Sequence, residues 1–215
     1  FPEEAKYKDI EYAKKAYKKF VDTLSKSYST RAVVFATLHT DATILLMDML
    51  EESGLKCFVG KVNMDRNSTD ELIETTESSI DSTVKWLDIC KYRYKNIKPI
   101  ITPRFIPSCS DELMKELGKI RGDIYGLQSH LSENPKEVEW VRELCPDSDG
   151  YLDAYNKRGN LNKSKVDTVM AHCVYSDDKE IELLKEKNVY VAHCPQSNIC
   201  LSSGIAPIRK FLDKG

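Results

Sequence analysis

The chain has 215 residues, and its 32 basic and 34 acidic side chains give a net charge of −2 and a pI of about 6.2. A nucleic acid or an anionic membrane would favour a basic excess, so this charge balance argues against both as partners. Apolar residues make up 41% of the chain, enough for one large core, and no apolar run approaches the ~20 residues of a membrane span.

Seven cysteines are scattered along the chain, and none of them forms a Cys-x-x-Cys pair. An odd, scattered set in a chain of this size indicates reduced thiols and a cytoplasmic protein. The alternative is a thiolate metal site, for which the usual ligand spacing is missing. The N-terminal stretch is charged and helical in pattern, and it shows no signal peptide.

Local patterns predict one helix and then six repeats of a strand followed by a helix. Apolar residues at helical spacing mark the first helix, over 6–27, and lysines fill its other face. Short apolar runs mark the strands, at 31–37, 56–62, 98–102, 124–129, 166–171 and 189–192.

Capping residues and apolar periodicity predict where the later helices begin. The predicted N-caps are Asp41, Ser68 (in a capping box with Glu71), Ser110, Asn134 (before Pro135), and Ser176 or Asp177. The helix behind Ser68 should bury a face made of Leu72, Ile73, Thr76, Ile80, Val84 and Leu87. A short helical pattern at 151–155 interrupts the polar connection 146–165, and the last helix covers 205–212, with Gly215 as its C-cap.

Parallel strands need crossover connections, and each predicted helix provides one. Six such units favour an α/β fold of the TIM type, a (β/α)8 barrel of ~250 residues, and an open doubly wound sheet is the rival fold. The predicted pattern begins and ends with a helix, so the barrel would lack its first and last strands and leave two sheet edges exposed. We therefore expect residues 1–215 to be the central part of one barrel domain from a longer chain.

The chain has four histidines, and each follows the carboxyl end of a predicted strand. In parallel α/β folds ligands bind at these ends, so His39, His130, His172 and His193 are expected to share one face. A histidine at a strand end can also be a hydrogen-bonded core residue. This structural role suits His193 and stays equally open for His39, whereas neighbouring polar residues favour a functional role for His130 and His172.

Glu133 and Arg104 are the polar residues that favour a functional role for the histidines at these strand ends. An imidazole can ligate a metal, and a carboxylate within reach, here Glu133, can move a proton of metal-bound water. Arg104 precedes Phe105 at a strand end, where a planar guanidinium beside an aromatic ring suits a flat polar heterocycle. The alternatives are a surface carboxylate in the first turn of a helix for Glu133 and a salt bridge at the barrel rim for Arg104.

A catalytic zinc needs three or four N or O ligands. The sequence offers His130 and, as a second candidate, His172, and it contains no His-x-His. The visible ligand set is therefore incomplete, in agreement with the missing first and last strands.

Several segments together resemble the guanine deaminases, a branch of the amidohydrolase superfamily. The segment Ser-His-Leu-Ser-Glu (129–133) and the tripeptide Ala-His-Cys (171–173) mark the wider superfamily, which includes cytosine deaminases and chlorohydrolases. Two further segments, Thr-Pro-Arg-Phe (102–105) and Gly-Lys-Val-x-Met-Asp (60–65), narrow the resemblance from the superfamily to the guanine deaminases. It extends over nearly the whole chain, through 35–41, 59–65, 102–105, 107–110, 128–134, 170–173 and 191–198.

The resemblance implies a metal-dependent hydrolase barrel with a small β-sandwich and one Zn²⁺ per subunit. His130 would be a zinc ligand, Glu133 the proton shuttle and His172 the residue that orients the hydrolytic water. Arg104 and Phe105 would hold the purine, which His130 and Glu133 would also contact. The other ligands of the family, a His-x-His and an Asp, and its substrate-binding Gln have no match in this sequence. The chain alone should therefore be inactive.

The implied reaction is the hydrolytic deamination of guanine to xanthine and ammonia, by a cytoplasmic enzyme that is typically a homodimer. No nucleic-acid or membrane partner is expected. Two alternatives stay open. One is a sister amidohydrolase that acts on another aminated or chlorinated heterocycle, and the other is a truncated, non-catalytic binding module.

Overall fold

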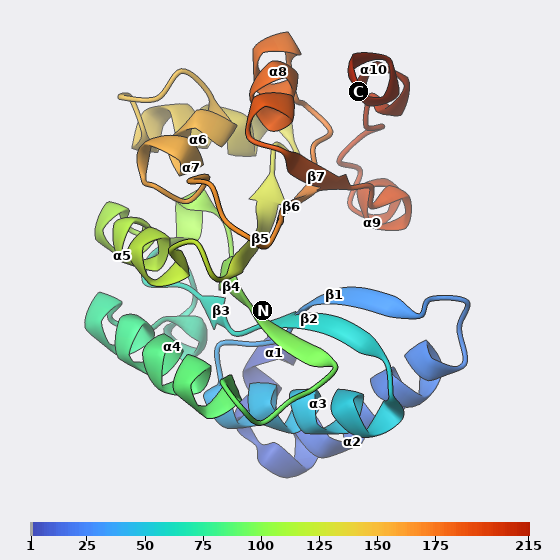
Figure 1. Ribbon diagram of the computed structural model, residues 1–215. Helices are drawn as coiled ribbons and strands as arrows, with labels where there is room; N and C mark the ends of the chain where they lie inside the picture. The colour runs from blue at the N-terminus through green and yellow to red at the C-terminus, as the bar shows by residue number, and fades with distance from the viewer. Residues whose placement is uncertain (1) are drawn as a thin grey trace. The chain divides into compact units, whose positions relative to one another are not determined.

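The computed structural model describes residues 2–215, in which strands and helices alternate along the chain (Figure 1). Two compact units follow each other, Phe1–Thr102 and Pro103–Gly215. The strand pairs β1–β2 and β2–β4 in the first unit and β5–β6 and β6–β7 in the second are parallel, which confirms the predicted α/β class. The closed eight-stranded barrel and the assignment of 1–215 to one domain stay predictions.

The first unit is built on a parallel sheet in the order β1-β2-β4. β1 (Arg31–Phe35) pairs with β2 (Lys56–Gly60), β2 pairs with β4 (Ile97–Pro103), and the short β3 (Val62–Asn63) also pairs with β4. In Figure 1 α2 and α3 lie side by side against this sheet. The helices of this unit are α1 (Pro2–Ala5), η1 (Lys6–Lys8), α2 (Ile10–Ser25), α3 (Thr40–Ser53), η2 (Asp70–Leu72) and α4 (Thr76–Cys90).

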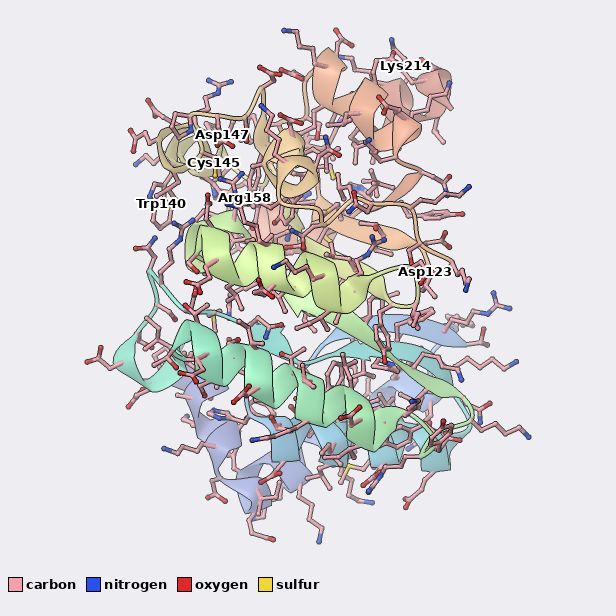
Figure 2. The ribbon with its side chains drawn as sticks, turned by 60° about the vertical axis from the view of Figure 1, so that its left-hand side comes forward. Asp123, Trp140, Cys145, Asp147, Arg158 and Lys214 are labelled. Carbon is pink, nitrogen blue, oxygen red and sulfur yellow. The ribbon has the colours of Figure 1, made fainter. Side chains whose placement is uncertain are left out.

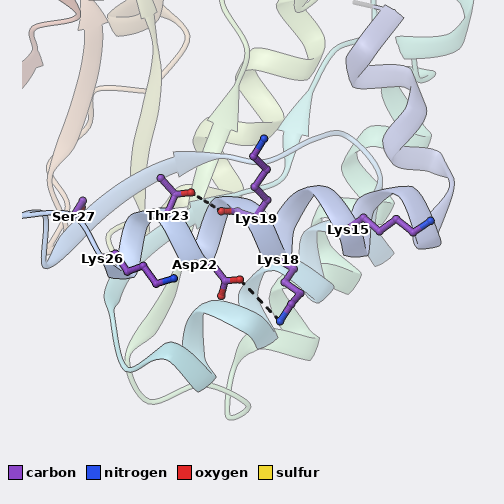
Figure 3. Close-up of a pocket in the computed structure, with 7 residues that line it drawn as sticks. All are labelled: Lys15, Lys18, Lys19, Asp22, Thr23, Lys26 and Ser27. Atoms are coloured by element: carbon purple, nitrogen blue, oxygen red, sulfur yellow. Dashed lines mark hydrogen bonds and ion pairs between the residues drawn. The ribbon is translucent and has the colours of Figure 1, made fainter.

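Helix α2 has the two faces that the sequence predicts. It begins at an Asp9 cap, whose carboxylate accepts from two backbone N–H groups, and it buries Ala13, Tyr17 and Val21. Its lysines and Asp22 line a shallow, solvent-exposed hollow on the other side (Figure 3). One ion pair there, between Lys18 and Asp22, is exposed and 4.0 Å long, so it contributes little to stability.

Two of the predicted helix starts in this unit are wrong. Helix α3 begins at Thr40, with His39 rather than Asp41 as N-cap, although Gly54 ends it in the left-handed conformation as expected. The Ser68–Glu71 capping box does not form, and Thr75 caps α4 instead.

A buried ion pair explains the later start of α4. Lys61 is fully buried and bonds the Glu74 carboxylate at 3.0 Å, while the Glu74 backbone N–H donates to the Met64 carbonyl. These bonds hold the chain extended just before Thr75. The buried face of the helix is consequently Ser79, Thr83, Trp86, Leu87 and Cys90, and of the predicted face Leu72 lies outside the helix and Val84 is exposed.

The second unit contains the parallel strands β5 (Gly126–Leu131), β6 (Thr168–His172) and β7 (Val189–Ala192). β5 pairs with β6 from Leu127↔Thr168 to Leu131↔His172, and β6 pairs with β7. His130 is thus the penultimate residue of β5 and His172 the last residue of β6, so both lie within strands rather than after them. The helices are η3 (Ile106–Ser108), α5 (Asp111–Arg121), α6 (Pro135–Leu144), α7 (Tyr151–Lys157), α8 (Asp178–Glu186), α9 (Pro195–Cys200) and α10 (Ile208–Lys214).

Most predicted caps of this unit are confirmed. The side chains of Ser110, Asn134 and Asp177 each accept from a backbone N–H at the start of their helix, which also decides between Ser176 and Asp177. The last segment differs, because α9 was not predicted and α10 begins at Ile208 rather than at residue 205.

Arg158 anchors the polar connection between α6 and β6. Its buried guanidinium donates to Asp111 at 2.8 Å and to the Ala154 carbonyl at 3.1 Å, and it lies 3.4 Å from Asp147. Figure 2 shows Arg158 beside Asp147 and Cys145. One side chain thus joins the start of α5 to the loop before α7.

Two sequence expectations concern cysteines and membranes. All seven cysteines are free thiols in the part of the chain that the structure describes. Among residues 2–215, no helix combines the length and the apolar character that crossing a bilayer requires.

Candidate functional site

His130 and His172 come together at the carboxyl ends of β5 and β6. Their rings are stacked, with centroids 5.4 Å apart. The register alone would not bring them together, because Leu131 is the cross-strand partner of His172 and adjacent residues of a strand point to opposite faces. The backbone of His172 has a φ of +76°, and this left-handed turn breaks the alternation and explains the contact with His130.

The backbone of Arg104 fixes the orientation and the tautomer of His130. The Arg104 carbonyl lies 2.7 Å from His130 Nδ1, and because a carbonyl only accepts, Nδ1 carries the proton. Nε2 is then deprotonated, which is the form that binds a metal. Burial, and to a smaller extent the neighbouring His172 and Arg104 side chains, lower the pKa of His130 to about 4, so the ring is neutral near pH 7.

A buried hydroxyl network supports the backbone of His130. Tyr155 of α7 donates to the His130 carbonyl at 2.9 Å, and its hydroxyl lies 2.7 Å from that of Ser129. Ser129 also donates to the Pro103 carbonyl at 2.7 Å. The strand end that carries His130 is therefore held by α7 as well as by its neighbour in the sheet.

Glu133 lies on the turn between β5 and α6, as predicted. The turn is tight, because Ser132 has a φ of +48° and Asn134 already caps α6. One carboxylate oxygen of Glu133, Oε2, lies 3.6 Å from His172 Nε2, and the other, Oε1, accepts a hydrogen bond of 3.1 Å from the Ser203 hydroxyl. The carboxylate is thus shared between the end of β6 and the turn after α9.

Asn198 of α9 is a site residue to which the sequence gave no role. Its Oδ1 lies 2.7 Å from His172 Nδ1, so Nδ1 carries a proton and donates to it, and Nε2 is directed to Glu133. The segment 191–198 contributed to the family resemblance, and that was the only sequence signal for Asn198. Ser203 gave no signal at all.

Arg104 and Phe105 follow β4 directly and are both partly buried. The ring of Phe105 meets that of Trp140 edge to face, with centroids 6.5 Å apart. Of the predicted site residues, the second unit brings the side chains of His130, His172 and Glu133 together, whereas Arg104 contacts His130 through its backbone carbonyl and Phe105 is its neighbour in the chain.

His39 and His193 are not part of this group. His39 belongs to the first unit, where it caps α3. Burial lowers its pKa, and its Nε2 has no hydrogen-bond partner among the described residues. His193 follows β7 directly and is exposed, so the structural role predicted for it, a core histidine, is wrong.

The site holds one histidine prepared for a metal and a carboxylate beside it. No group of three His, Cys, Asp or Glu side chains within residues 2–215 is arranged to hold an ion. Chemically, the arrangement can bind a metal through His130 Nε2, accept a proton on Glu133 and accept a hydrogen bond on His172 Nε2.

A comparison with protein families shows which family this chain belongs to. The model of the amidohydrolase family matches residues 8–215. The chain belongs to the amidohydrolase family. Amidohydrolases are generally metal-dependent hydrolases, in agreement with the prepared state of His130.

Curated relatives and solved structures similar to this amidohydrolase chain include several guanine deaminases. A curated guanine deaminase from Dictyostelium discoideum is 43% identical over 99% of this chain and 47% of its own length. The crystal structure of a guanine deaminase from C. acetobutylicum, described with guanine bound in the active site, has a TM-score of 0.95 and 46% identity over 99% of this chain and 51% of its own. The chain spans about half the length of the curated relatives it matches.

A more distant structure shares the fold alone. An adenosine deaminase from Xanthomonas campestris, described with bound zinc, has a TM-score of 0.78 at 18% identity over 95% of this chain and 44% of its own.

Proposed function

We propose that the complete gene product is a zinc-dependent guanine deaminase, which hydrolyses guanine to xanthine and ammonia. One observation carries the proposal: the Glu133 carboxylate lies 3.6 Å from His172 Nε2, beside a His130 ring that presents a deprotonated Nε2. The choice of guanine rests on the relatives, one of which is described with this base in its active site.

His130 fits the metal that the family requires. Its Nδ1–H donates to a backbone carbonyl, which is the usual support of a metal-ligating histidine, and its ring is neutral near pH 7. We assign His130 as one zinc ligand. When bound, zinc supplies a nucleophile at neutral pH, because it lowers the pKa of a water molecule. The proposed barrel, of which β1 to β7 would form the central strands, is the fold in which such sites occur.

Glu133 would move the protons of the reaction. Its Oε2 takes a proton from the water and delivers it to a ring nitrogen of guanine, which makes C2 electrophilic. The water oxygen forms a bond to C2. Glu133 then takes the remaining proton from this new C2 hydroxyl and gives it to the amino nitrogen, so that the C2–N bond breaks, ammonia leaves and the C2 carbonyl of xanthine forms. His172 would orient the water, since its Nδ1 donates to Asn198 and its Nε2 can accept a hydrogen bond from the water.

Arg104 and Phe105 would hold the purine. The guanidinium can donate two parallel hydrogen bonds to the O6 side of the base, which a lysine cannot reproduce. Phe105 is partly buried against Trp140, so it offers a fixed ring edge or face to the heterocycle. His130 and Glu133 contact the base at the reacting carbon.

Steady-state kinetics of the complete gene product tests the proposal. Xanthine and ammonia should form from guanine in equal amounts, and guanine should be preferred over adenine, cytosine and aminated triazines. A preference for another ring would establish a sister hydrolase, and absence of both turnover and bound zinc would leave a binding module. The same family resemblance supports a cytoplasmic homodimer, which velocity sedimentation and cell fractionation test.

The substitution Glu133→Gln isolates the proton shuttle. The amide keeps the shape of the side chain and can still accept from Ser203, so guanine binding should survive while turnover falls by several orders of magnitude. Glu139→Gln, which removes an exposed carboxylate from the neighbouring helix α6, is the matched control. Near-normal kcat in Glu133→Gln would reject the role.

A further inference from the structure

We propose that Asn198 and Ser203, at the two ends of one short segment after β7, act as positioning residues that together orient His172 and Glu133. The inference rests on the proposed function, because it concerns the residues that would handle the proton and the water. We call the segment 198–203 the clamp. The clamp contacts two different strand ends of the second unit. Asn198 contacts His172 at the end of β6, and Ser203 contacts Glu133 on the turn after β5.

Asn198 determines which nitrogen of His172 faces Glu133. Asn198 is 1% exposed, and its Oδ1 is 2.7 Å from His172 Nδ1. An amide oxygen can only accept, so it retains the tautomer in which Nδ1 is protonated and Nε2, on the side of Glu133, is an acceptor. Without this bond the proton could lie on Nε2, which would then donate to the Glu133 carboxylate instead of accepting from water.

The other half of the Asn198 amide, its buried Nδ2, makes no hydrogen bond among the described residues. A buried donor without a partner destabilises the folded state, so an apolar side chain of similar volume would suit packing better. The residue is therefore better explained by what its oxygen does to His172.

Ser203 distinguishes the two oxygens of Glu133. Its buried hydroxyl donates to Oε1 at 3.1 Å, and Oε2 is the oxygen that approaches His172. A carboxylate with one oxygen held can rotate less about its terminal bond. Ser203 would thus keep Oε2 on the side of the reacting water, a role that a hydroxyl at this position performs and a methyl group cannot.

The backbone makes the two contacts a single unit. The Ser203 N–H donates to the Asn198 carbonyl at 2.8 Å, and the Asn198 N–H donates to the Cys194 carbonyl at 2.9 Å. Gly204 follows with a φ of +122°, and a Cβ atom there would lie 3.0 Å from the Tyr175 hydroxyl. Tyr175 in turn donates its backbone N–H to the Ser132 carbonyl, next to Glu133. The clamp is therefore packed against the loops that carry both reactive side chains.

The first test reads the tautomer of His172 directly and does not depend on activity. Long-range ¹H–¹⁵N spectra of the imidazole rings in the complete gene product, with the His172 signal assigned by its loss in His172→Gln, should show protonated Nδ1. In Asn198→Leu the signal should lose this pattern, and in Asn198→Asp, which retains an accepting oxygen, it should keep it. An Nε2-protonated His172 in the wild type, or an unchanged signal in Asn198→Leu, would overturn the role of Asn198.

The second test separates kcat from KM for guanine. Asn198→Leu should lower kcat by ~10–100-fold with little change in KM, as substitutions of residues that orient site histidines do, and Asn198→Asp should recover most of the loss. Gln196→Leu, an exposed position of the same helix, is the control for the added leucine. Equal losses in Asn198→Leu and Asn198→Asp, or a change confined to KM, would contradict the positioning role.

Ser203 has its own pair of variants. Ser203→Ala should lower kcat, Ser203→Thr should retain it through the hydroxyl, and Ser29→Ala, at an exposed serine outside the clamp, should have no effect. If Asn198→Leu does not fold, this serine series and Asn198→Asp still decide the matter. A wild-type protein inactive on guanine would refute the proposed function, while the histidine spectra would still decide whether Asn198 sets the tautomer.

Discussion

The buried acid Glu180 offers a measurable test of how the loop around Glu133 is held. Glu180 lies in the first turn of α8, is 8% exposed, and accepts the Ser132 hydroxyl at 2.6 and 3.0 Å on its two oxygens. Burial raises the pKa of its carboxyl from the ordinary 4.5 to about 7, because the charged form is poorly solvated there. Folding therefore favours protonated Glu180.

The sign of the stability effect follows from that direction. The folded-state pKa is above the unfolded value, so the contribution of Glu180 is fully present below pH 4.5 and is lost as the pH rises through about 7. The difference between these two values corresponds to ~3 kcal/mol of unfolding free energy. Above pH 7 Glu180 is ionised in the folded wild type, and its buried negative charge lowers the unfolding free energy by about this amount.

The substitution Glu180→Gln removes the charge and keeps an oxygen that can accept from Ser132. The unfolding free energy of Glu180→Gln minus that of the wild type should therefore increase by up to ~3 kcal/mol between pH 4.5 and pH 8. Urea unfolding followed by tryptophan fluorescence at several pH values measures this, provided the m values agree. Glu186→Gln, at an exposed position of the same helix, is the control. Parallel pH curves for Glu180→Gln and the wild type would refute the reasoning.

Three further outcomes are expected. Arg104→Lys should lower kcat/KM for guanine through a higher KM, because the parallel pair of donors is lost, and unchanged kinetics would reject this contact. Tyr155→Phe should reduce the urea unfolding free energy by ~1–3 kcal/mol, since the His130 carbonyl and the Ser129 hydroxyl lose a partner at 2.9 and 2.7 Å. Chelation should abolish guanine turnover in the complete gene product and added Zn²⁺ should restore it, whereas turnover that survives complete metal removal would exclude the zinc proposal.

The strands and the predicted site residues could be located from sequence because their signals are local. Asn134 before Pro135 marks the start of α6 whatever the rest of the chain does, and a short apolar run before His130 predicts β5. The positions of His130 and Glu133 at one strand end follow from these two signals alone. That is why the candidate site could be drawn before any tertiary contact was known.

The parts that sequence did not predict depend on contacts between distant residues. Asn198 meets His172 across 26 residues of chain, and Ser203 meets Glu133 across 70. The start of α4 was misplaced for the same reason, since the buried contact of Lys61 with Glu74 overrides a good local capping signal at Ser68. Tertiary burial decides such positions, and periodicity carries no information about it.

Backbone strain is the last element of the site, and it accounts for the positions of both reactive side chains. Ser132, His172 and Cys173 all have positive φ although none is glycine, and residues in that region are costly unless their surroundings hold them. The surroundings are visible: Cys173 donates its N–H to the Leu131 carbonyl, and Tyr175 donates to the Ser132 carbonyl, both at 2.9 Å. Each strained turn is thus hydrogen-bonded to the other. A shift of the turn that carries Glu133 would break bonds to the turn that carries His172, so the two side chains are expected to move together or not at all.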